Sequence, residues 1–291
     1  MFKDSHPVVN LIYFTFVLVI TMFSNDPVFC VATLVLAWAY SLILKGKGTM
    51  KNNLLLALPV YILMALINTL FTHNGATVLF YINDSRITLE ALSYGLTAAT
   101  VLTAVIIWFM CFSEIMSSDK LIYIFGKARP VMGLTMSMIF RFIPLLRQRF
   151  REIQLGQKCM GREEQTKLVG KIRQFAKEVS ILISWSLEAA IETSDSMEAR
   201  GYGLKGRTSF HLFKITPRDK RYLAIITGLA ILPMICLFMG ETTITYYPEI
   251  VLKDWTALRI ISLISYIMMM STPIVIDITG NKKWQLFGQT N

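Results

Sequence analysis

Six stretches of the chain are apolar and long enough to suggest membrane-spanning helices, and they constrain the fold more than any other feature. A spanning helix needs about 20 apolar residues, with a range of about 17–25, so the first stretch is marginal. The segment Ser24-Asn25-Asp26-Pro27 consists of residues typical of turns and joins the first two apolar stretches. The six stretches are Val8–Phe23, Val28–Leu44, Leu54–Phe71, Ala91–Phe112, Tyr222–Met239 and Thr256–Ile278. We therefore predict an all-α integral membrane protein with about six transmembrane helices.

The composition agrees with a protein embedded in the lipid bilayer. Hydrophobic residues make up 54% of the chain and charged residues only 16%, whereas a soluble chain has about 25% charged residues. The four cysteines form no CxxC pair and the three histidines lie far apart in the sequence. This pattern predicts neither a disulfide framework nor a metal site.

The positive charges indicate an orientation. With the N-terminus inside, the inner segments 1–7, 45–53, 114–221 and 279–291 hold all of the 29 Lys and Arg residues except Arg86, Lys253 and Arg259. An excess of Lys and Arg marks cytoplasmic segments. We therefore expect both termini and residues 114–221 to be cytoplasmic. The same rule accounts for the net charge of +10, so no nucleic-acid partner is predicted.

The predicted organisation has three parts. Residues 1–113 form a membrane domain of four helices, residues 114–221 a cytoplasmic domain, and residues 222–291 two further membrane helices. Outside, residues 76–89 have β-branched and aromatic residues on both sides of Asn83-Asp84-Ser85, which predicts a short extracellular β-hairpin.

Residues 114–221 contain two long amphipathic helices. The first, in which Pro144 is expected to cause a kink or a restart, has an apolar face and a basic stripe. The second runs from about Glu178 to Arg200 and has an apolar face and an acidic stripe. In the first helix, the apolar face consists of Ile139, Phe142, Ile143, Leu146, Phe150 and Ile153. Its basic stripe consists of Arg147, Arg151, Gln154 and Lys158. In the second helix, the apolar face consists of Val179, Leu182, Ile183, Ala190 and Met197. Its acidic stripe consists of Glu188, Glu192 and Asp195. Two interpretations stay open: surface helices with solvated charged faces, or helices that cross and present their ends to a partner.

The predicted spans lack the groups that ion transport or catalysis would need. Their ionisable residues, Arg259 and Asp277, lie near the ends of the last span, whereas a proton relay has such groups in mid-membrane. Gly46-Lys47-Gly48-Thr49 differs from an ATP-binding loop, because the leading Gly is Ser41 and Gly48 stands where a Ser or Thr would bind magnesium. We therefore expect no catalytic residue and no cofactor bound to this chain; ATP and magnesium would be bound by another subunit.

The second amphipathic helix ends in Met197-Glu198-Ala199-Arg200-Gly201-Tyr202-Gly203. Gly201 and Gly203 permit the left-handed backbone that ends a helix. Ala199 and Gly201 are small, so the end is narrow and Arg200 projects from it. A guanidinium in that position can bind a carboxylate of a partner through two hydrogen bonds. The alternative is an ordinary helix end with a nearby arginine.

Three stretches give the chain its resemblance to a known family. They are Arg141 to Leu146, Glu198 to Gly203, and Thr216-Pro217-Arg218-Asp219. Together with the order of the apolar segments, they resemble the transmembrane coupling component (T component) of energy-coupling-factor (ECF) transporters. The resemblance implies a bacterial or archaeal cell membrane and long cytoplasmic coupling helices. It also implies two ABC-type ATPase subunits, and a separate small membrane protein (S component) that captures a vitamin or metal ion.

In that family, two X-Arg-X helix ends dock into the two ATPases. The second maps onto Ala199, Arg200 and Gly201. The first falls on Cys159-Met160-Gly161, where Met160 takes the place of the arginine. The resemblance then implies that either Arg162, within Gly161-Arg162-Glu163, or the apolar Met160 serves the first docking site.

Three other classes of protein remain as alternatives. Glu188-Ala189-Ala190 is similar to the start of the cytoplasmic loop of a conventional ABC permease, but Ser194 stands where that loop has a Gly. A membrane-bound enzyme of lipid or cofactor metabolism would use His211 with Asp219, or Glu114 with Asp119. A pure assembly scaffold has no distinguishing motif.

Overall fold

The computed structural model describes residues 2–72, 74–82, 85–160, 168–204, 213–251 and 255–288. The chain divides into two compact units. Unit 1 comprises Met1–Ser117 and Phe213–Asn291, and unit 2 comprises Ser118–Leu212. The cytoplasmic domain was predicted over residues 114–221, and its place in the cytoplasm stays a prediction.

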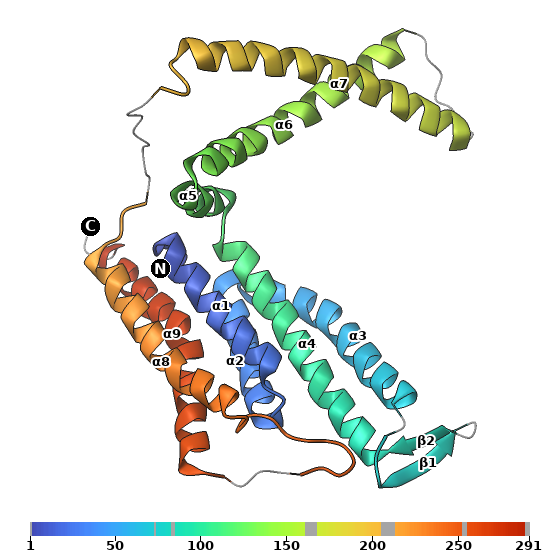
Figure 1. Cartoon of the computed structure of the whole chain (residues 1–291), viewed down its shortest axis with the longest axis vertical. Coiled ribbons are helices and arrows are strands. Elements are labelled where there is room, and N and C mark those ends of the chain that lie inside the picture. The colour runs from blue at the N-terminus through green and yellow to red at the C-terminus, as the bar shows by residue number, and fades with distance from the viewer. Residues whose placement is uncertain are drawn as a thin grey trace. The chain divides into compact units, whose positions relative to one another are not determined.

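In its described residues, unit 1 is a bundle of six helices that run alongside one another (Figure 1). Four of them are long and apolar enough to cross a membrane, and Pro7–Phe23 and Leu55–Phe71 are shorter apolar helices. The helices are α1 (Pro7–Phe23), α2 (Pro27–Lys45), α3 (Lys47–Phe71), α4 (Leu89–Ile115), α8 (Pro217–Phe238) and α9 (Ala257–Gly288), and a 3₁₀ turn η1 (Phe2–Asp4) precedes α1. The prediction of an all-α membrane protein is confirmed.

Local capping sets where the helices of unit 1 begin. The Asp26 side chain accepts a hydrogen bond from the Val28 amide, and Pro27 occupies the first helical position of α2. At α8, Thr216 and Asp219 form a reciprocal capping box. This box starts α8 at Pro217, five residues before the apolar run that predicted the helix.

The predicted β-hairpin is present at one end of α4 (Figure 1). Strands β1 (Val78–Ile82) and β2 (Ser85–Thr88) pair antiparallel, with Val78 opposite Thr88 and Tyr81 opposite Arg86. The Thr88 hydroxyl then accepts a hydrogen bond from the Ala91 amide and caps α4. The hairpin is therefore joined to the bundle without an intervening loop.

Aromatic residues form the centre of unit 1. The indole of Trp108 on α4 stacks on Tyr40 of α2 at 5.9 Å and meets Tyr13 and Phe14 of α1 edge-on at 6.1 Å. These rings and Phe2 of η1 are fully buried. Such pairs add about 0.5–1.5 kcal/mol each beyond the area that they bury. The N-terminal turn is thereby part of the core.

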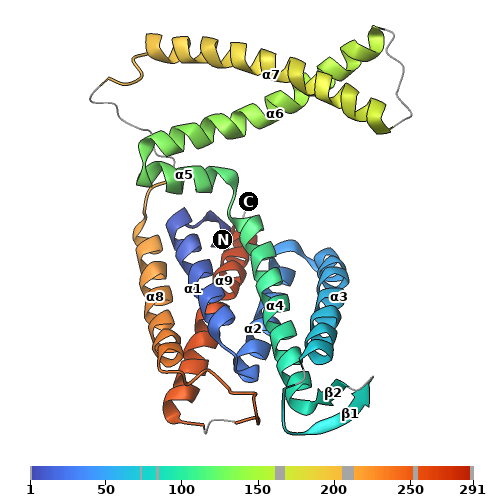
Figure 2. The same ribbon diagram turned by 45° about the vertical axis from the view of Figure 1, so that its right-hand side comes forward.

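Unit 2 contains α5 (Ser118–Ala128), α6 (Pro130–Cys159) and α7 (Leu168–Ala199). The two long helices α6 and α7 cross each other in both views (Figures 1 and 2). α6 is a single helix through Pro144, so the possible restart there does not occur. α7 begins ten residues earlier than expected, because Leu168, Ile172 and Phe175 extend its helical period.

Candidate functional site: the ends of the two crossed helices

The end of α7 has the hydrogen-bond pattern of a Schellman motif. The Tyr202 amide donates to the Met197 carbonyl at 3.0 Å and the Gly201 amide to the Glu198 carbonyl at 2.9 Å. Gly201 has φ of +79°, a conformation in which a side chain is strained. A Cβ there would also lie 3.0 Å from Leu204 Cδ1. Glycine at this position therefore ends the helix sharply, immediately after Arg200.

Arg200 projects from this end without a partner in the described part of the chain. Its side chain is exposed, and no hydrogen bond or ion pair joins it to another described residue. Ala199 is exposed and Gly201 is half-buried. The structure thus places Ala199, Arg200 and Gly201 together as a narrow tip that carries one available guanidinium.

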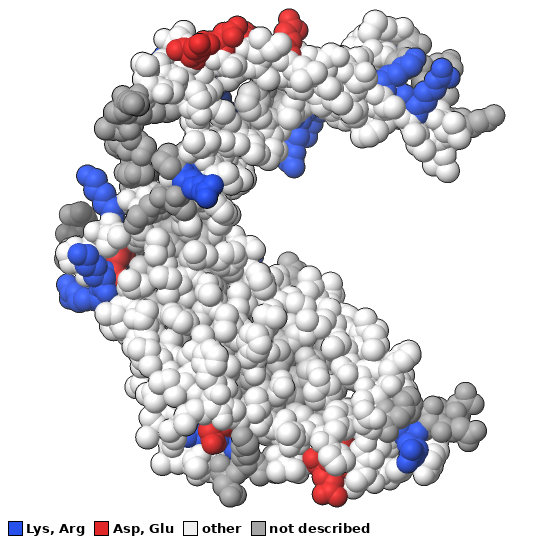
Figure 3. Space-filling view, viewed as in Figure 1, with Lys and Arg blue, Asp and Glu red and all other residues white. Residues whose placement is uncertain are grey.

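The surface leading to this tip is acidic. Glu188, Glu192, Asp195 and Glu198 are all exposed on the second half of α7, and acidic side chains gather over this part of the unit (Figure 3). Glu198 lies in the last turn of α7, where a carboxylate is unfavourable to the helix dipole by about 0.3–1 kcal/mol. The stability of α7 therefore does not explain the position of Glu198.

The end of α6 differs in chemistry. α6 ends at Cys159, and the Met160 amide donates to the Gly156 carbonyl at 3.1 Å. The Met160 side chain is 73% exposed, so this end presents an apolar group. Gly161 and Arg162 lie outside the described residues. The structure therefore shows where Met160 lies and leaves the choice between Met160 and Arg162 open.

A buried carboxylate lies where α6 and α7 cross. Glu178 of α7 is only 3% exposed, and its carboxylate accepts hydrogen bonds of 3.1 Å from Gln154 of α6 and from Gln174 of α7. The rings of Phe150 and Phe175 meet edge-on at 5.9 Å beside it. Sequence analysis placed Gln154 in the basic stripe, left open whether that face is solvated or the helices cross, and did not predict this network. The signal was Gln174 four residues before Glu178, which is a hydrogen-bonding spacing on a helix.

A cation also contacts an aromatic ring at the crossing. The Arg149 guanidinium lies 4.9 Å from the centre of the Trp185 ring, and it pairs with Glu152 at 2.7 Å. Hydrogen bonds from Gln148 and Arg149 lower the pKa of Glu152. Both helix ends are thus carried on two long helices that are joined by polar, aromatic and cationic contacts.

Comparisons with known proteins identify the family to which this chain belongs. Residues 2–212, which include both helix ends, match the family model described as CbiQ, cobalt transport protein. The chain belongs to this family. It is also similar to the energy-coupling factor transporter transmembrane protein EcfT of Staphylococcus aureus (strain 04-02981), with 26% identity over 245 residues. That similarity covers 78% of this chain and 90% of the relative. The resemblance to the T component of ECF transporters is confirmed.

In this T component, two glycines form a close contact between α5 and α6. The two helices pack against each other, and a Cβ at Gly133 of α6 would overlap the Cα of Gly126 on α5. Since glycine allows two backbones to touch, this pair fixes the direction in which α6 leaves α5. Sequence analysis did not identify this contact, because the two residues are seven apart on different helices.

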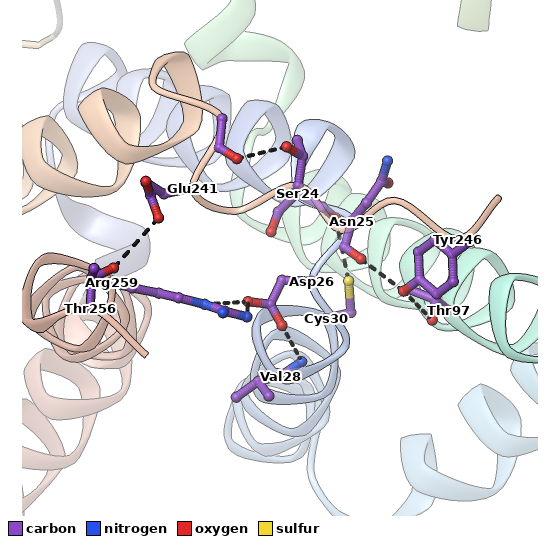
Figure 4. Close-up of polar contacts among 12 residues, drawn as sticks. Ser24, Asn25, Asp26, Val28, Cys30, Thr97, Glu241, Tyr246, Thr256 and Arg259 are labelled. Carbon is purple, nitrogen blue, oxygen red and sulfur yellow. Dashed lines mark hydrogen bonds and ion pairs between the residues drawn. The ribbon is translucent and has the colours of Figure 1, made fainter. Parts of the chain in front are cut away.

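A polar network joins helices α2, α4 and α9 of unit 1 (Figure 4). Arg259 of α9 forms an ion pair with Asp26 at the start of α2, and both side chains are almost fully buried. The Arg259 guanidinium also lies 4.7 Å from the centre of the Trp255 ring. Nearby, the Tyr246 hydroxyl donates to the Asn25 carbonyl at 3.0 Å, and burial raises the pKa of Tyr246.

Two of the three acidic residues considered for an enzyme, Glu114 and Asp219, have structural partners. The Glu114 carboxylate lies 3.3 Å from the Lys45 amino group and 3.5 Å from that of Lys3. Asp219 belongs to the capping box of α8. His211 lies outside the described residues. These contacts give Glu114 and Asp219 structural roles, and Asp119 is exposed.

Proposed function

We propose that this T component couples ATP hydrolysis by two ABC-type ATPase subunits to the uptake of a vitamin or metal ion. The substrate would be captured by a separate small membrane protein, the S component. The observation that carries the proposal is Arg200 on the glycine-ended tip of α7, which is exposed and has no side-chain partner among the described residues. A long cation on a narrow end can enter a groove of a partner and bind a carboxylate there.

The two docking contacts would differ in kind. Arg200 offers five N–H donors, and Met160 offers an exposed, flexible apolar side chain. Because α6 and α7 are joined at their crossing, a movement of one ATPase at one tip would also move the other helix. This connection supports a coupling role rather than two independent anchors.

The exposed apolar residues of unit 2 support a protein partner in addition to the ATPases. Leu168, Val169, Ile172, Leu187 and Ile191 of α7 are each more than three-fifths exposed. Exposed apolar surface of this extent marks an interaction site. We propose that the S component contacts these faces and that the bilayer covers the apolar surface of unit 1.

The substrate and cofactors follow from the same proposal. The family description refers to cobalt transport and the similar Staphylococcus protein to an energy-coupling factor transporter, so we propose a vitamin or a metal ion such as cobalt. ATP and magnesium would be bound by the ATPases, and this chain would be a non-catalytic subunit. Residues 114–221 and both termini would face the cytoplasm.

The test is co-purification of the tagged full chain from its native host in mild detergent. Wild type is expected to retain two ATPase subunits and a small membrane protein. Arg200→Ala is expected to lose one ATPase, because removing one member of a buried charge pair costs about 2–5 kcal/mol of binding. Arg173→Ala, an exposed arginine on the same helix, is the matched control. Met160→Ala and Arg162→Ala identify the residue of the first site. If wild type retains no ATPase, the proposal is wrong.

A further inference from the structure

Four cationic side chains surround the N-terminal end of α8. They are Lys214, Arg218, Lys220 and Arg221, and all four are exposed. Figure 3 shows Lys and Arg gathered at this end of the helix. Within the described residues, none of the four forms an ion pair. The patch therefore carries four cations that are held in no ion pair among the described residues.

The acidic residue in this stretch does not neutralise the patch. Asp219 is buried, and its oxygens accept hydrogen bonds from the Thr216 amide at 3.0 Å, the Thr216 hydroxyl at 2.7 Å and the His6 amide at 3.2 Å. These three bonds hold the carboxylate against the protein. The exposed side of the helix end retains the four positive charges.

Arg218 is held in place by an aromatic neighbour. Its Nε donates a 2.8 Å hydrogen bond to the Tyr222 hydroxyl, and the guanidinium lies 5.4 Å from the centre of the Tyr222 ring. Neither terminal amino group of Arg218 has a described partner. A guanidinium oriented in this way can bind a phosphate through two parallel hydrogen bonds.

The surface of α8 places this patch at the edge of the bilayer. Asp219, Ile226, Ala230 and Pro233 are buried on one face, and the cations lie off that face. Beyond Tyr222 the exposed residues become apolar: Ile225, Ile231, Leu232, Ile235 and Phe238. Tyrosine is enriched where the membrane meets water. The cations before Tyr222 therefore lie at the depth of the lipid phosphates.

We propose that the N-terminal end of α8 binds the headgroup of an anionic phospholipid. Arg218 binds the lipid phosphate, and Lys214, Lys220 and Arg221 attract the negative charge of the surrounding headgroups. Basic residues at this depth are each worth about 1 kcal/mol of attraction to an anionic membrane. This site does not depend on the proposed coupling function, and either proposal can fail without the other.

The test is lipid binding to the purified full chain, measured by native mass spectrometry during titration with phosphatidylglycerol or phosphatidylcholine. Wild type is expected to bind phosphatidylglycerol more tightly than phosphatidylcholine. Arg218→Ala is expected to weaken phosphatidylglycerol binding about fivefold, and Arg218→Lys less. The double variant Lys220→Ala/Arg221→Ala is expected to weaken phosphatidylglycerol binding more than Lys220→Ala or Arg221→Ala alone.

Two controls make the result specific. Arg86→Ala removes an exposed cation from the hairpin and is expected to leave lipid binding unchanged. Inorganic phosphate at the concentration of the lipid is expected not to displace it, because a free phosphate has no acyl chains to bury beside α8. Equal binding of the two lipids by wild type, or equal losses in Arg218→Ala and Arg86→Ala, overturns the proposal.

Discussion

The amide of Gln154 on α6 donates a 3.1 Å hydrogen bond to the buried carboxylate of Glu178 on α7. A hydrogen bond to a charged group contributes about 1.5–3 kcal/mol. Since Gln174 donates to the other carboxylate oxygen, both oxygens of Glu178 are satisfied. This one side chain thereby fixes the point at which α6 and α7 cross.

The coupling between Gln154 and Glu178 is measurable with a double-mutant cycle. We expect Gln154→Ala and Glu178→Ala to destabilise the protein by less together than the sum of the single changes, with an interaction free energy of about 1–2 kcal/mol. The measurement is reversible unfolding in mixed detergent micelles. Gln148→Ala with Glu178→Ala is the control pair, because Gln148 bonds to Glu152 instead. Strictly additive effects for Gln154 and Glu178 would contradict the assignment.

The buried ion pair in unit 1 predicts an asymmetry. Arg259→Ala leaves the Asp26 carboxylate buried without its cation, which costs about 3–5 kcal/mol. Asp26→Asn combined with Arg259→Met is expected to cost less, since no charge is left unpaired and Asn still caps α2. Unfolding by denaturant in micelles measures both. A double variant that is less stable than Arg259→Ala would rule out this account.

The glycine contact between α5 and α6 predicts an effect of position. Gly133→Ala is expected to push the two helices apart and to cost about 1–3 kcal/mol, because a side chain there overlaps Gly126. Gly156→Ala in the same helix meets open space and is expected to stabilise α6 by about 0.5–1 kcal/mol. Distances between spin labels on α5 and α6 report the separation. Similar distances in the two variants would show that the contact does not set the direction of α6.

The end of α7 predicts a local change in dynamics. Gly201→Val is strained at φ of +79° and is expected to loosen the Schellman motif, so that the Gly201-site and Tyr202 amides exchange with solvent faster. Gly201→Asn is expected to exchange more slowly than Gly201→Val, because Asn tolerates the left-handed conformation. Hydrogen exchange read by mass spectrometry over residues 197–204 tests this. Unchanged exchange in both variants would show that glycine is not needed there.

The acidic surface of α7 predicts an effect on association rate. Under the proposed function, replacing Glu188, Glu192 and Asp195 with their amides is expected to slow binding of the ATPase subunits about tenfold at low salt and much less at high salt, because long-range charge attraction is screened by ions. The measurement is the association rate at two salt concentrations. A loss that is the same at both concentrations would indicate a short-range contact instead.

Local sequence patterns by themselves determined much of this protein. Runs of apolar residues predicted the membrane helices, and β-branched and aromatic residues on both sides of Asn83-Asp84-Ser85 predicted the hairpin. The small residues around Arg200 and the glycines after it predicted a helix that ends sharply. Each of these features depends on neighbours within a few residues, so a periodicity or a cap is visible in the sequence.

Only the tertiary structure decided which distant residues meet. Gln154 fits a solvated stripe as well as a buried contact, and Asp26 and Arg259 are 233 residues apart. Gly126 and Gly133 touch because α5 and α6 fold back at Arg129 and Pro130. These contacts depend on where helices cross, which side-chain periodicity leaves undetermined. The sequence therefore specified the elements and the end of α7, and packing specified how α6 and α7 are held together.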